Sequence, residues 1–409
     1  MSISNDSERF FQTSTSLAEN ERKRRKAANT FGDPIKFPTK LLGVTLSRLF
    51  DAASDTVFVA EAGGALSAVR LSSGEVSRIG QSAPAPVTCL TSYGGRQSAA
   101  SDAITQSVFA GAWDKNITRF TLSQDATSGA LGINQVSFKA HNDFVKCLLV
   151  APTPDKQTVL LSGGADGDVN IWTFEGKRLA VLKPQSRGIE CLALDPLSSP
   201  EAPRVFFSTS QREIYSFELP PVNATSAAPL KISEPIIQHE TSVYKLEFDS
   251  DGDLWTASAD KTAKRLVREN KFVADTTLAH PDFVRDIVIF EPSSLAITAC
   301  RDEEVRVWNS GTSQLLHLFT GHFEEVTGLA MTGSLLISVS IDATLRKWSL
   351  APSDLKKAIT ESKDSKLLDQ VPEPVSDFGG LTEEEEAQLR ALMEEEEADN
   401  LEKMVIDEQ

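Results

Sequence analysis

Short runs in which apolar and polar residues alternate recur along most of the chain, bounded by Gly, Asp or Ser. Successive side chains of a β-strand point to opposite faces of its sheet, so runs of about four to eight alternating residues predict half-buried antiparallel strands. The pattern extends from about residue 35 to about residue 350. We therefore expect an all-β fold over this part of the chain.

Four of the five histidines lie in similar sequence settings. Each precedes an apolar strand, then Ser/Thr-x-x-x-Asp and a second alternating run, which in three cases ends in Trp. His239, His280 and His322 are 41 and 42 residues apart, and His141 precedes His239 by 98 residues. Self-similarity at such a period is typical of repeat proteins, in which each repeat forms one structural unit.

These units resemble the WD-repeat family, in which about 40–45 residues build one four-stranded blade of a β-propeller. The resemblance is strong in the third, fifth, sixth and seventh units and weaker in the others. The position of the turn Asp is held in turn by Gly63, Asp114, Asp166, Gln211, Asp260, Asp302 and Asp342. The resemblance implies a seven-bladed β-propeller.

The last unit supplies three strands, whereas a blade needs four. We expect Pro34–Lys40 to provide the missing outer strand, because closure of the ring removes exposed sheet edges. The chain then divides into a flexible basic arm (1–33), the propeller (34–350), a polar linker (351–380) and an acidic tail (381–409). Insertions at 92–106, 121–135, 195–204 and 218–236 are expected to form surface loops.

The two tails differ in charge. Twelve acidic and two basic residues in 381–409 account for most of the net charge of −17. Thr382 and Glu385 form a capping-box pattern, which predicts a helix to about Met404. This tail is either a ligand of the ring or solubilising charge. The basic run Arg22–Lys26 is either a nuclear-import signal or a nucleic-acid arm. The structural alternatives are a solvated charge run or a short helix that precedes the ring.

The recurring His, Ser/Thr, Asp and Trp have a structural role in the family that the repeats resemble, where they form a buried hydrogen-bonded chain. Carried over to this sequence, the chains are His141–Ser162–Asp166–Trp172, His280–Thr298–Asp302–Trp308 and His322–Ser338–Asp342–Trp348. The fifth unit keeps His239, Thr256 and Asp260 but has Leu266 in place of Trp.

No sequence feature indicates an enzyme or a cofactor. The phosphate-loop pattern GxxxxGK[ST] and the HExxH and GxSxG motifs do not occur. The histidines belong to different repeats, so we expect no metal site. No window approaches eighteen uninterrupted apolar residues, so a transmembrane helix is not expected. Since the acidity is not offset by a basic surface, nucleic acid is not an expected partner.

The resemblance places the partner-binding surface on one face of the ring. It lies at residues before the turn Asp and on either side of the first buried aliphatic residue of each inner strand. Trp, Tyr, Phe and Arg are the residue types that dominate interface hot spots. The expected binding residues are Trp113, Phe144, Lys146, Tyr244, Phe283, Arg285 and Arg301. For Phe144 and Phe283, inward packing against loops is equally compatible with the sequence.

We therefore expect a non-catalytic scaffold or adaptor, a monomer within an intracellular protein complex in the cytoplasm or nucleus. Its expected partners are other proteins, including an acidic peptide or helix. The alternative is substrate recognition or ubiquitin binding in protein turnover, with a propeller-fold enzyme as a remote third. The Trp-Asp-x-Arg motif of cullin-ligase receptors is replaced after Trp172, Trp308 and Trp348, which disfavours that route.

Overall fold

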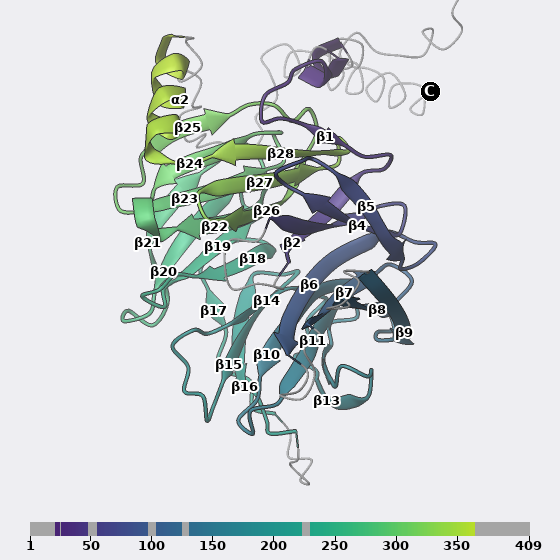
Figure 1. Cartoon of the computed structure of the whole chain (residues 1–409). Coiled ribbons are helices and arrows are strands. Elements are labelled where there is room, and N and C mark those ends of the chain that lie inside the picture. The colour runs from purple at the N-terminus through teal and green to yellow at the C-terminus, as the bar shows by residue number, and fades with distance from the viewer. Residues whose placement is uncertain are drawn as a thin grey trace, which may run out of the picture. The chain divides into compact units, whose positions relative to one another are not determined.

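Seven four-stranded antiparallel sheets follow one another around a ring (Figure 1). They lie within the part of the chain that this computed structural model describes, which is residues 21–24, 26–47, 55–96, 104–124, 131–222 and 230–364. In six of the sheets the first strand along the chain is innermost and each later strand pairs outward, whereas in the closing sheet the N-terminal strand Ile35–Lys36 is outermost. The all-β, seven-bladed propeller expected from the sequence is confirmed.

The blades are named here in chain order. Blade 1 contains β2 (Leu41–Leu46), β3 (Thr56–Glu61), β4 (Ala65–Arg70) and β5 (Val76–Gln81). Blade 2 contains β6 (Val87–Arg96), β7 (Ile104–Ala112), β8 (Asn116–Gln124) and β9 (Leu131–Lys139). Blade 3 contains β10 (Val145–Pro152), β11 (Thr158–Gly164), β12 (Val169–Trp172) and β13 (Arg178–Leu182). Blade 4 contains β14 (Ile189–Leu194), β15 (Arg204–Thr209), β16 (Glu213–Glu218) and β17 (Ile236–Ile237).

The remaining blades complete the ring. Blade 5 contains β18 (Val243–Phe248), β19 (Leu254–Ser258), β20 (Thr262–Val267) and β21 (Val273–Ala279). Blade 6 contains β22 (Val284–Phe290), the short helix η2 (Glu291–Ser293), β23 (Leu295–Cys300), β24 (Val305–Asn309) and β25 (Leu315–Phe319). Blade 7 contains β26 (Val326–Thr332), β27 (Leu335–Ser340), β28 (Thr344–Ser349) and β1 (Ile35–Lys36).

Ring closure joins the two ends of the propeller in blade 7. Ile35 pairs with Leu345 and Lys36 with Thr344, so the purple N-terminal segment lies beside the green β28 in Figure 1. The next residue, Phe37, is buried and donates its N–H to the carbonyl of Ala343 at 2.8 Å. The expected N-terminal closing strand is confirmed, although only Ile35–Lys36 of the predicted Pro34–Lys40 has strand geometry.

Apolar side chains fill the junctions between neighbouring blades. The described residues form seven core clusters, and each cluster draws its members from two adjacent blades. At the closing junction, for example, Phe37 and Ile337 of blade 7 pack with Leu41 and Val57 of blade 1. Each blade therefore depends on both neighbours for burial of its two faces.

Blade 2 differs from the loops expected at 92–106 and 121–135. There the strands continue as long hairpins, because β6 pairs with β7 as far as Arg96 and Ile104, and β8 pairs with β9 from Gln124 and Leu131. Ser, Ala and Gly in these segments have a low preference for strands, but the continuous pairing of β6 with β7 and of β8 with β9 overrides it.

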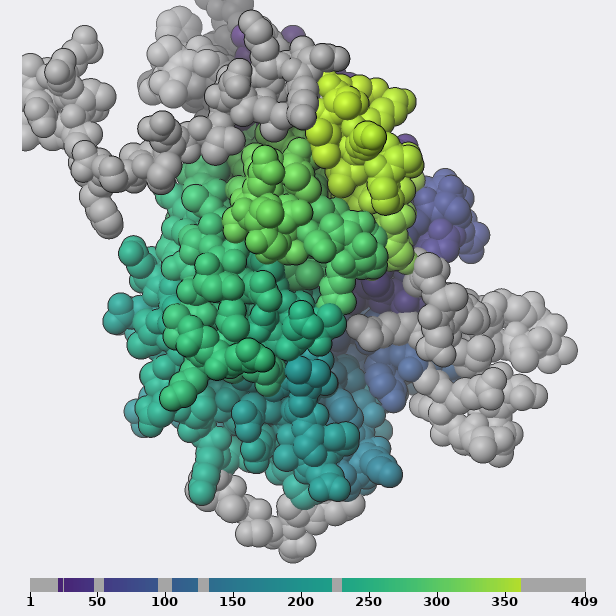
Figure 2. All heavy atoms as spheres, turned by 90° about the vertical axis from the view of Figure 1, so that its left-hand side faces the viewer, coloured from purple at the N-terminus to yellow at the C-terminus, as the bar shows by residue number. Residues whose placement is uncertain are grey.

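A helix occupies the start of the expected linker. Helix α2 (Pro352–Asp364) has Pro in its first turn, where the missing N–H costs nothing. Leu355 and Ile359, one turn apart, pack against the core between blades 6 and 7. In Figure 2, α2 forms the yellow-green block against the green surface of the ring. The predicted tail helix in 381–409 lies outside the described residues.

The closing residue Phe37 is expected to matter far more than its exposed neighbour. Phe37→Ala should lower the free energy of unfolding by about 3 kcal/mol or more, because it leaves a cavity where blade 7 meets blade 1. Lys36→Ala, at the preceding and exposed position, should change it by less than about 0.5 kcal/mol. Urea unfolding of both variants measures the difference, and equal effects would contradict closure through Phe37.

Candidate functional site

A buried chain of polar side chains crosses blade 3. Trp172 donates its indole N–H to Ser162 Oγ at 2.9 Å, and Ser162 Oγ lies 2.8 Å from His141 Nε2. The other ring nitrogen, Nδ1, lies 2.9 Å from the Asp166 carboxylate. Since a carboxylate only accepts, Nδ1 carries the proton, Nε2 accepts from Ser162, and each donor in the chain has an acceptor.

Blade 7 has the same arrangement, and blade 5 has part of it. His322 lies 2.8 Å from both Asp342 and Ser338, and Trp348 donates to Ser338 at 2.9 Å. In blade 5, His239 contacts Asp260 and Thr256 at 2.8 and 2.7 Å. Leu266 stands where Trp would complete that chain, so Thr256 has no indole donor, and its hydroxyl lies 3.1 Å from the carbonyl of Lys264.

Blade 6 departs from the expected chain. His280 Nε2 lies 2.8 Å from Thr298 Oγ1, and Trp308 donates to the same oxygen at 2.9 Å. His280 Nδ1, however, donates to the carbonyl of Leu278, and the Asp302 carboxylate is held instead by both terminal nitrogens of Arg306. The expected His280–Asp302 contact is therefore wrong, because the longer and permanently charged Arg306 side chain competes for the carboxylate.

Burial controls the charge state of these groups. Desolvation, reinforced by the Arg306 guanidinium, lowers the pKa of His280 to about 3. Burial also lowers the pKa of His322, although Asp342 opposes the shift. A general base near neutral pH needs a pKa close to that pH and contact with the substrate. A buried, neutral histidine whose two ring nitrogens are both hydrogen-bonded within a blade has neither. These side chains hold strands together.

Metal and thiol chemistry receive no support from the described part of the chain. Its His, Cys, Asp and Glu side chains form no group of three or more that could hold a metal ion. Burial raises the pKa of Cys89 to about 12, and it also raises the pKa of Cys191. Reactive thiols have a lowered pKa, so these cysteines on the inner strands are packing residues. None of the described helices is long and apolar enough to span a membrane.

A ring of backbone hydrogen bonds fixes the positions expected to bind partners. In all seven blades, the residue before the turn-Asp position donates its N–H to the carbonyl of the residue before the first inner aliphatic, at 2.8 to 3.1 Å. The donor and acceptor pairs are Ala62 and Lys40, Trp113 and Pro86, Ala165 and Phe144, Ser210 and Gly188, Ala259 and Ser242, Arg301 and Phe283, and Ile341 and Glu325. The bonds tie each turn to the start of its inner strand. Blades of a propeller surround a central channel, and the end of the ring that carries these seven bonds is called the channel mouth here.

The residue after each inner aliphatic sits at a β-bulge. The register of the inner strand shifts at this point in every blade, for example between Val145 and Cys147 and between Val284 and Asp286. A bulge leaves one residue unpaired and redirects its side chain. Lys146, Tyr244 and Arg285 are the extra residues in blades 3, 5 and 6.

Trp113 and Phe144 form an exposed aromatic pair. Their rings stack across the junction of blades 2 and 3, with centroids 5.0 Å apart and planes 17° apart. Both remain accessible, with 47% of Trp113 and 39% of Phe144 exposed. Phe283 differs, because it is half-buried with the Arg301 guanidinium 5.2 Å above its ring. The two phenylalanines of the Asp-Phe-Val pattern thus have different environments.

The cations near the mouth already have acidic neighbours. Arg285 lies 4.3 Å above the Tyr244 ring and 2.7 Å from the Glu325 carboxylate. Lys146 forms an ion pair with the carboxylate of Glu190. Arg301 is the most available of the three, because its side chain is 52% exposed and its distance to Asp282 is 4.0 Å.

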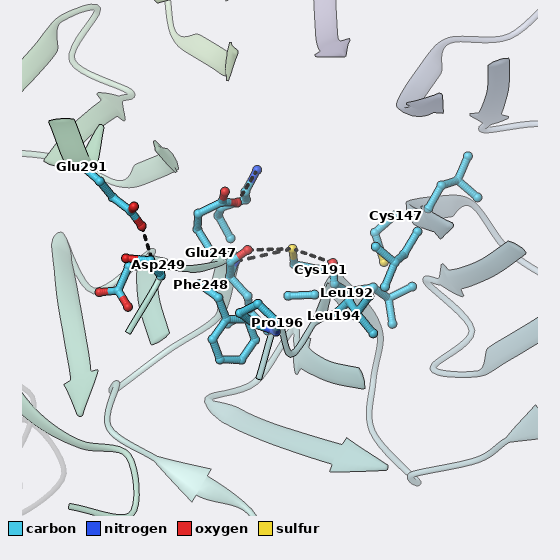
Figure 3. Close-up of a pocket in the computed structure, with 15 residues that line it drawn as sticks. Cys147, Cys191, Leu192, Leu194, Pro196, Glu247, Phe248, Asp249 and Glu291 are labelled. Atoms are coloured by element: carbon cyan, nitrogen blue, oxygen red, sulfur yellow. Dashed lines mark hydrogen bonds and ion pairs between the residues drawn. The ribbon is translucent and has the colours of Figure 1, made fainter. Parts of the chain in front are cut away.

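A hollow of about 580 Å³ is lined by the inner strands of blades 3 to 5 and by Glu291 of blade 6. Figure 3 shows Leu194, Pro196 and Phe248 grouped beside Cys191 in its lining. Its charged groups serve the fold: Lys245 lies 3.2 Å from Asp286, which also accepts the N–H of Leu329 and so ties three inner strands together. Sequence reasoning missed this tie because it joins residues from three repeats.

Comparison with known proteins agrees with this architecture. The model of the WD domain, G-beta repeat, matches residues 132–173 and 313–349. An uncharacterised WD repeat-containing protein of Schizosaccharomyces pombe is 30% identical over 393 residues, which cover 94% of this chain and 97% of that protein. The fold, the repeated His–Ser/Thr–Trp contacts and this full-length similarity define the class. The chain belongs to the WD-repeat family.

Other relatives match about half of this chain. Striatin-4 of Mus musculus is 27% identical over 224 residues, which span 54% of this chain and 23% of striatin-4. Kinesin-like protein klp-12 of Caenorhabditis elegans is 25% identical over 217 residues, which span 50% of this chain and 13% of klp-12. The chain thus covers less than a quarter of either protein. Propellers of this family generally serve as protein-interaction domains without catalytic activity.

Acidification is expected to destabilise the ring through His280. Its pKa of about 3 in the folded chain lies below the value of about 6.5 for an unfolded histidine, so unfolding takes up a proton between these values. Its contribution is present above pH 6.5 and is lost as the pH falls, by up to about 1.4 kcal/mol per pH unit. His280→Gln should therefore give a shallower decline from about pH 6 to pH 4.

Urea titrations at several pH values measure this slope. The other buried histidines contribute equally in both proteins, and the buried carboxylates with lowered pKa values act mainly below about pH 4. The difference in slope thus isolates His280. Equal slopes would contradict a neutral, buried His280.

Proposed function

We propose that the chain is a non-catalytic scaffold that holds a segment of another protein across the channel mouth, within a multiprotein assembly. The stacked pair of Trp113 and Phe144 carries this proposal. Large aromatic side chains that stay exposed on a rigid face are favoured anchors for partners, because covering them removes apolar area from water. Each is fixed by a backbone bond at the channel mouth, so little conformational freedom is lost on binding.

The same proposal assigns an acidic character to the bound segment. Arg301 is pinned through its backbone to Phe283 and stacks above that ring, which leaves its guanidinium half-exposed and held at long range by Asp282. A carboxylate from a partner can pair with this group more closely than Asp282 does. Lys146 and Arg285 have closer intramolecular partners, so they contribute to the electrostatic potential at the channel mouth rather than pair directly with the bound segment.

Removing the aromatic anchor should release partners without unfolding the ring. Affinity capture from native cells with Trp113→Ala or Phe144→Ala should retain about one tenth or less of the specific partners, as expected for a hot spot. Leu197→Ala is the matched control, because Leu197 is 55% exposed but follows β14 at the other end of the inner strands. If both anchor variants keep the wild-type melting temperature and still capture the same partners in the same amounts, this site is disproved.

The charge preference can be measured with a defined acidic probe. A peptide of residues 381–409, with twelve acidic and two basic residues, is titrated into a chain ending at residue 364. We expect binding at low salt that weakens several-fold with Arg301→Glu, because attraction becomes repulsion. Arg204→Glu, which is on β15 and also half-exposed, should leave the affinity unchanged. Binding indifferent to Arg301→Glu would overturn the acidic preference.

A further inference from the structure

Residues of the basic run Arg22–Lys26 are docked on an acidic site of blades 6 and 7. Arg22 forms a bidentate pair with Glu303, with N–O distances of 2.6 and 2.8 Å. Lys26 lies 2.8 Å from both Glu303 and Glu304, and Lys23 lies 2.8 Å from Glu324. Residues 21–24 are helical, which agrees with the short-helix alternative and differs from a fully flexible arm.

A second set of contacts fixes the chain directly after the run. The side-chain amide of Asn29 donates to the carbonyl of Gly321 at 2.9 Å, and its oxygen accepts from Arg346 at 2.7 Å. Arg346 also contacts the carbonyl of Phe31. These part-buried contacts do not use the basic side chains of the run and hold residues 29–31 in place, so the run can leave its site while the closing strand stays paired.

The acidic site is buried beneath the run. The side chains of Glu303 and Glu304 are only 8% and 13% exposed. Burial raises the pKa of Glu304 even though Lys26 opposes the shift, and its second carboxylate oxygen has no hydrogen-bond partner among the described residues. Buried carboxylates need a counter-charge, and here Arg22 and Lys26 supply it.

We propose that the site formed by Glu303, Glu304 and Glu324 masks the basic run from receptors that read Lys/Arg-rich segments, such as nuclear-import receptors. Such a receptor needs the cationic side chains, and Arg22, Lys23 and Lys26 cannot pair with the ring and with a second acidic surface at once. The docked and released states of residues 22–26 therefore compete. Release exposes an import signal that the docked chain hides.

Trypsin provides a first probe, because it also reads Lys and Arg side chains in an accessible segment. In the full chain, the isosteric Glu303→Gln/Glu304→Gln/Glu324→Gln triple variant should be cleaved within residues 22–27 about fivefold faster or more, since cleavage follows the open population. Raising the salt from about 50 mM to about 500 mM should accelerate cleavage of the wild type but not of the variant. Glu190→Gln, which breaks the pair with Lys146, is the matched control.

Nuclear accumulation of the full chain with a C-terminal fluorescent protein tests the receptor. The nuclear-to-cytoplasmic ratio should rise in the triple variant and return to the wild-type value when Arg22, Lys23 and Lys26 are also changed to Gln. Unchanged cleavage would show that the run is not held, and faster cleavage with an unchanged ratio would show that no import receptor reads it. Either result overturns the proposal. Melting temperatures exclude unfolding, and Glu324→Gln alone is the milder variant.

Discussion

Burial of blade against blade is the constraint on which this molecule depends. Each of the seven core clusters draws on two neighbouring sheets, so a blade has no apolar core of its own. A row of such blades would leave an apolar face uncovered at each end, and only a closed ring covers both. Two paired residues of β1 and the buried ring of Phe37 achieve closure between blades 7 and 1. The channel mouth, with its hydrogen-bonded turns, exists only because the ring closes.

Rigidity at the mouth follows from two repeated backbone features. A hydrogen bond ties each turn to the start of the inner strand, and a bulge then redirects the next side chain. Because both features involve the main chain, side chains at these positions can vary among blades without loss of the fold. This separation lets one face carry Trp113 and Phe144 on one side and Arg301 on another.

Sequence periodicity predicted the strands, the turns and the closing segment because these depend on local alternation and on a repeated unit. It missed α2, because the two positions that pack on the ring, Leu355 and Ile359, lie in a mostly polar stretch and form too short an apolar pattern to predict a helix. In blade 6, Arg306 rather than His280 binds the Asp302 carboxylate. Which side chain reaches the carboxylate depends on the three-dimensional arrangement, so the residue types alone do not predict it. The docking of Arg22 and Lys26 joins residues almost three hundred positions apart, beyond the reach of any local pattern.

The pairing of β1 with β28 also sets an order for biosynthesis. Ile35 leaves the ribosome about 300 residues before its partner Leu345, so the nascent N-terminus has to remain unpaired while six blades are made. Contacts of such long sequence separation form slowly, because a large loop is closed before they stabilise the chain. During this interval Phe37 is an exposed apolar side chain beside the basic residues 22–26. The two ends of the propeller are therefore joined in a single late step of folding.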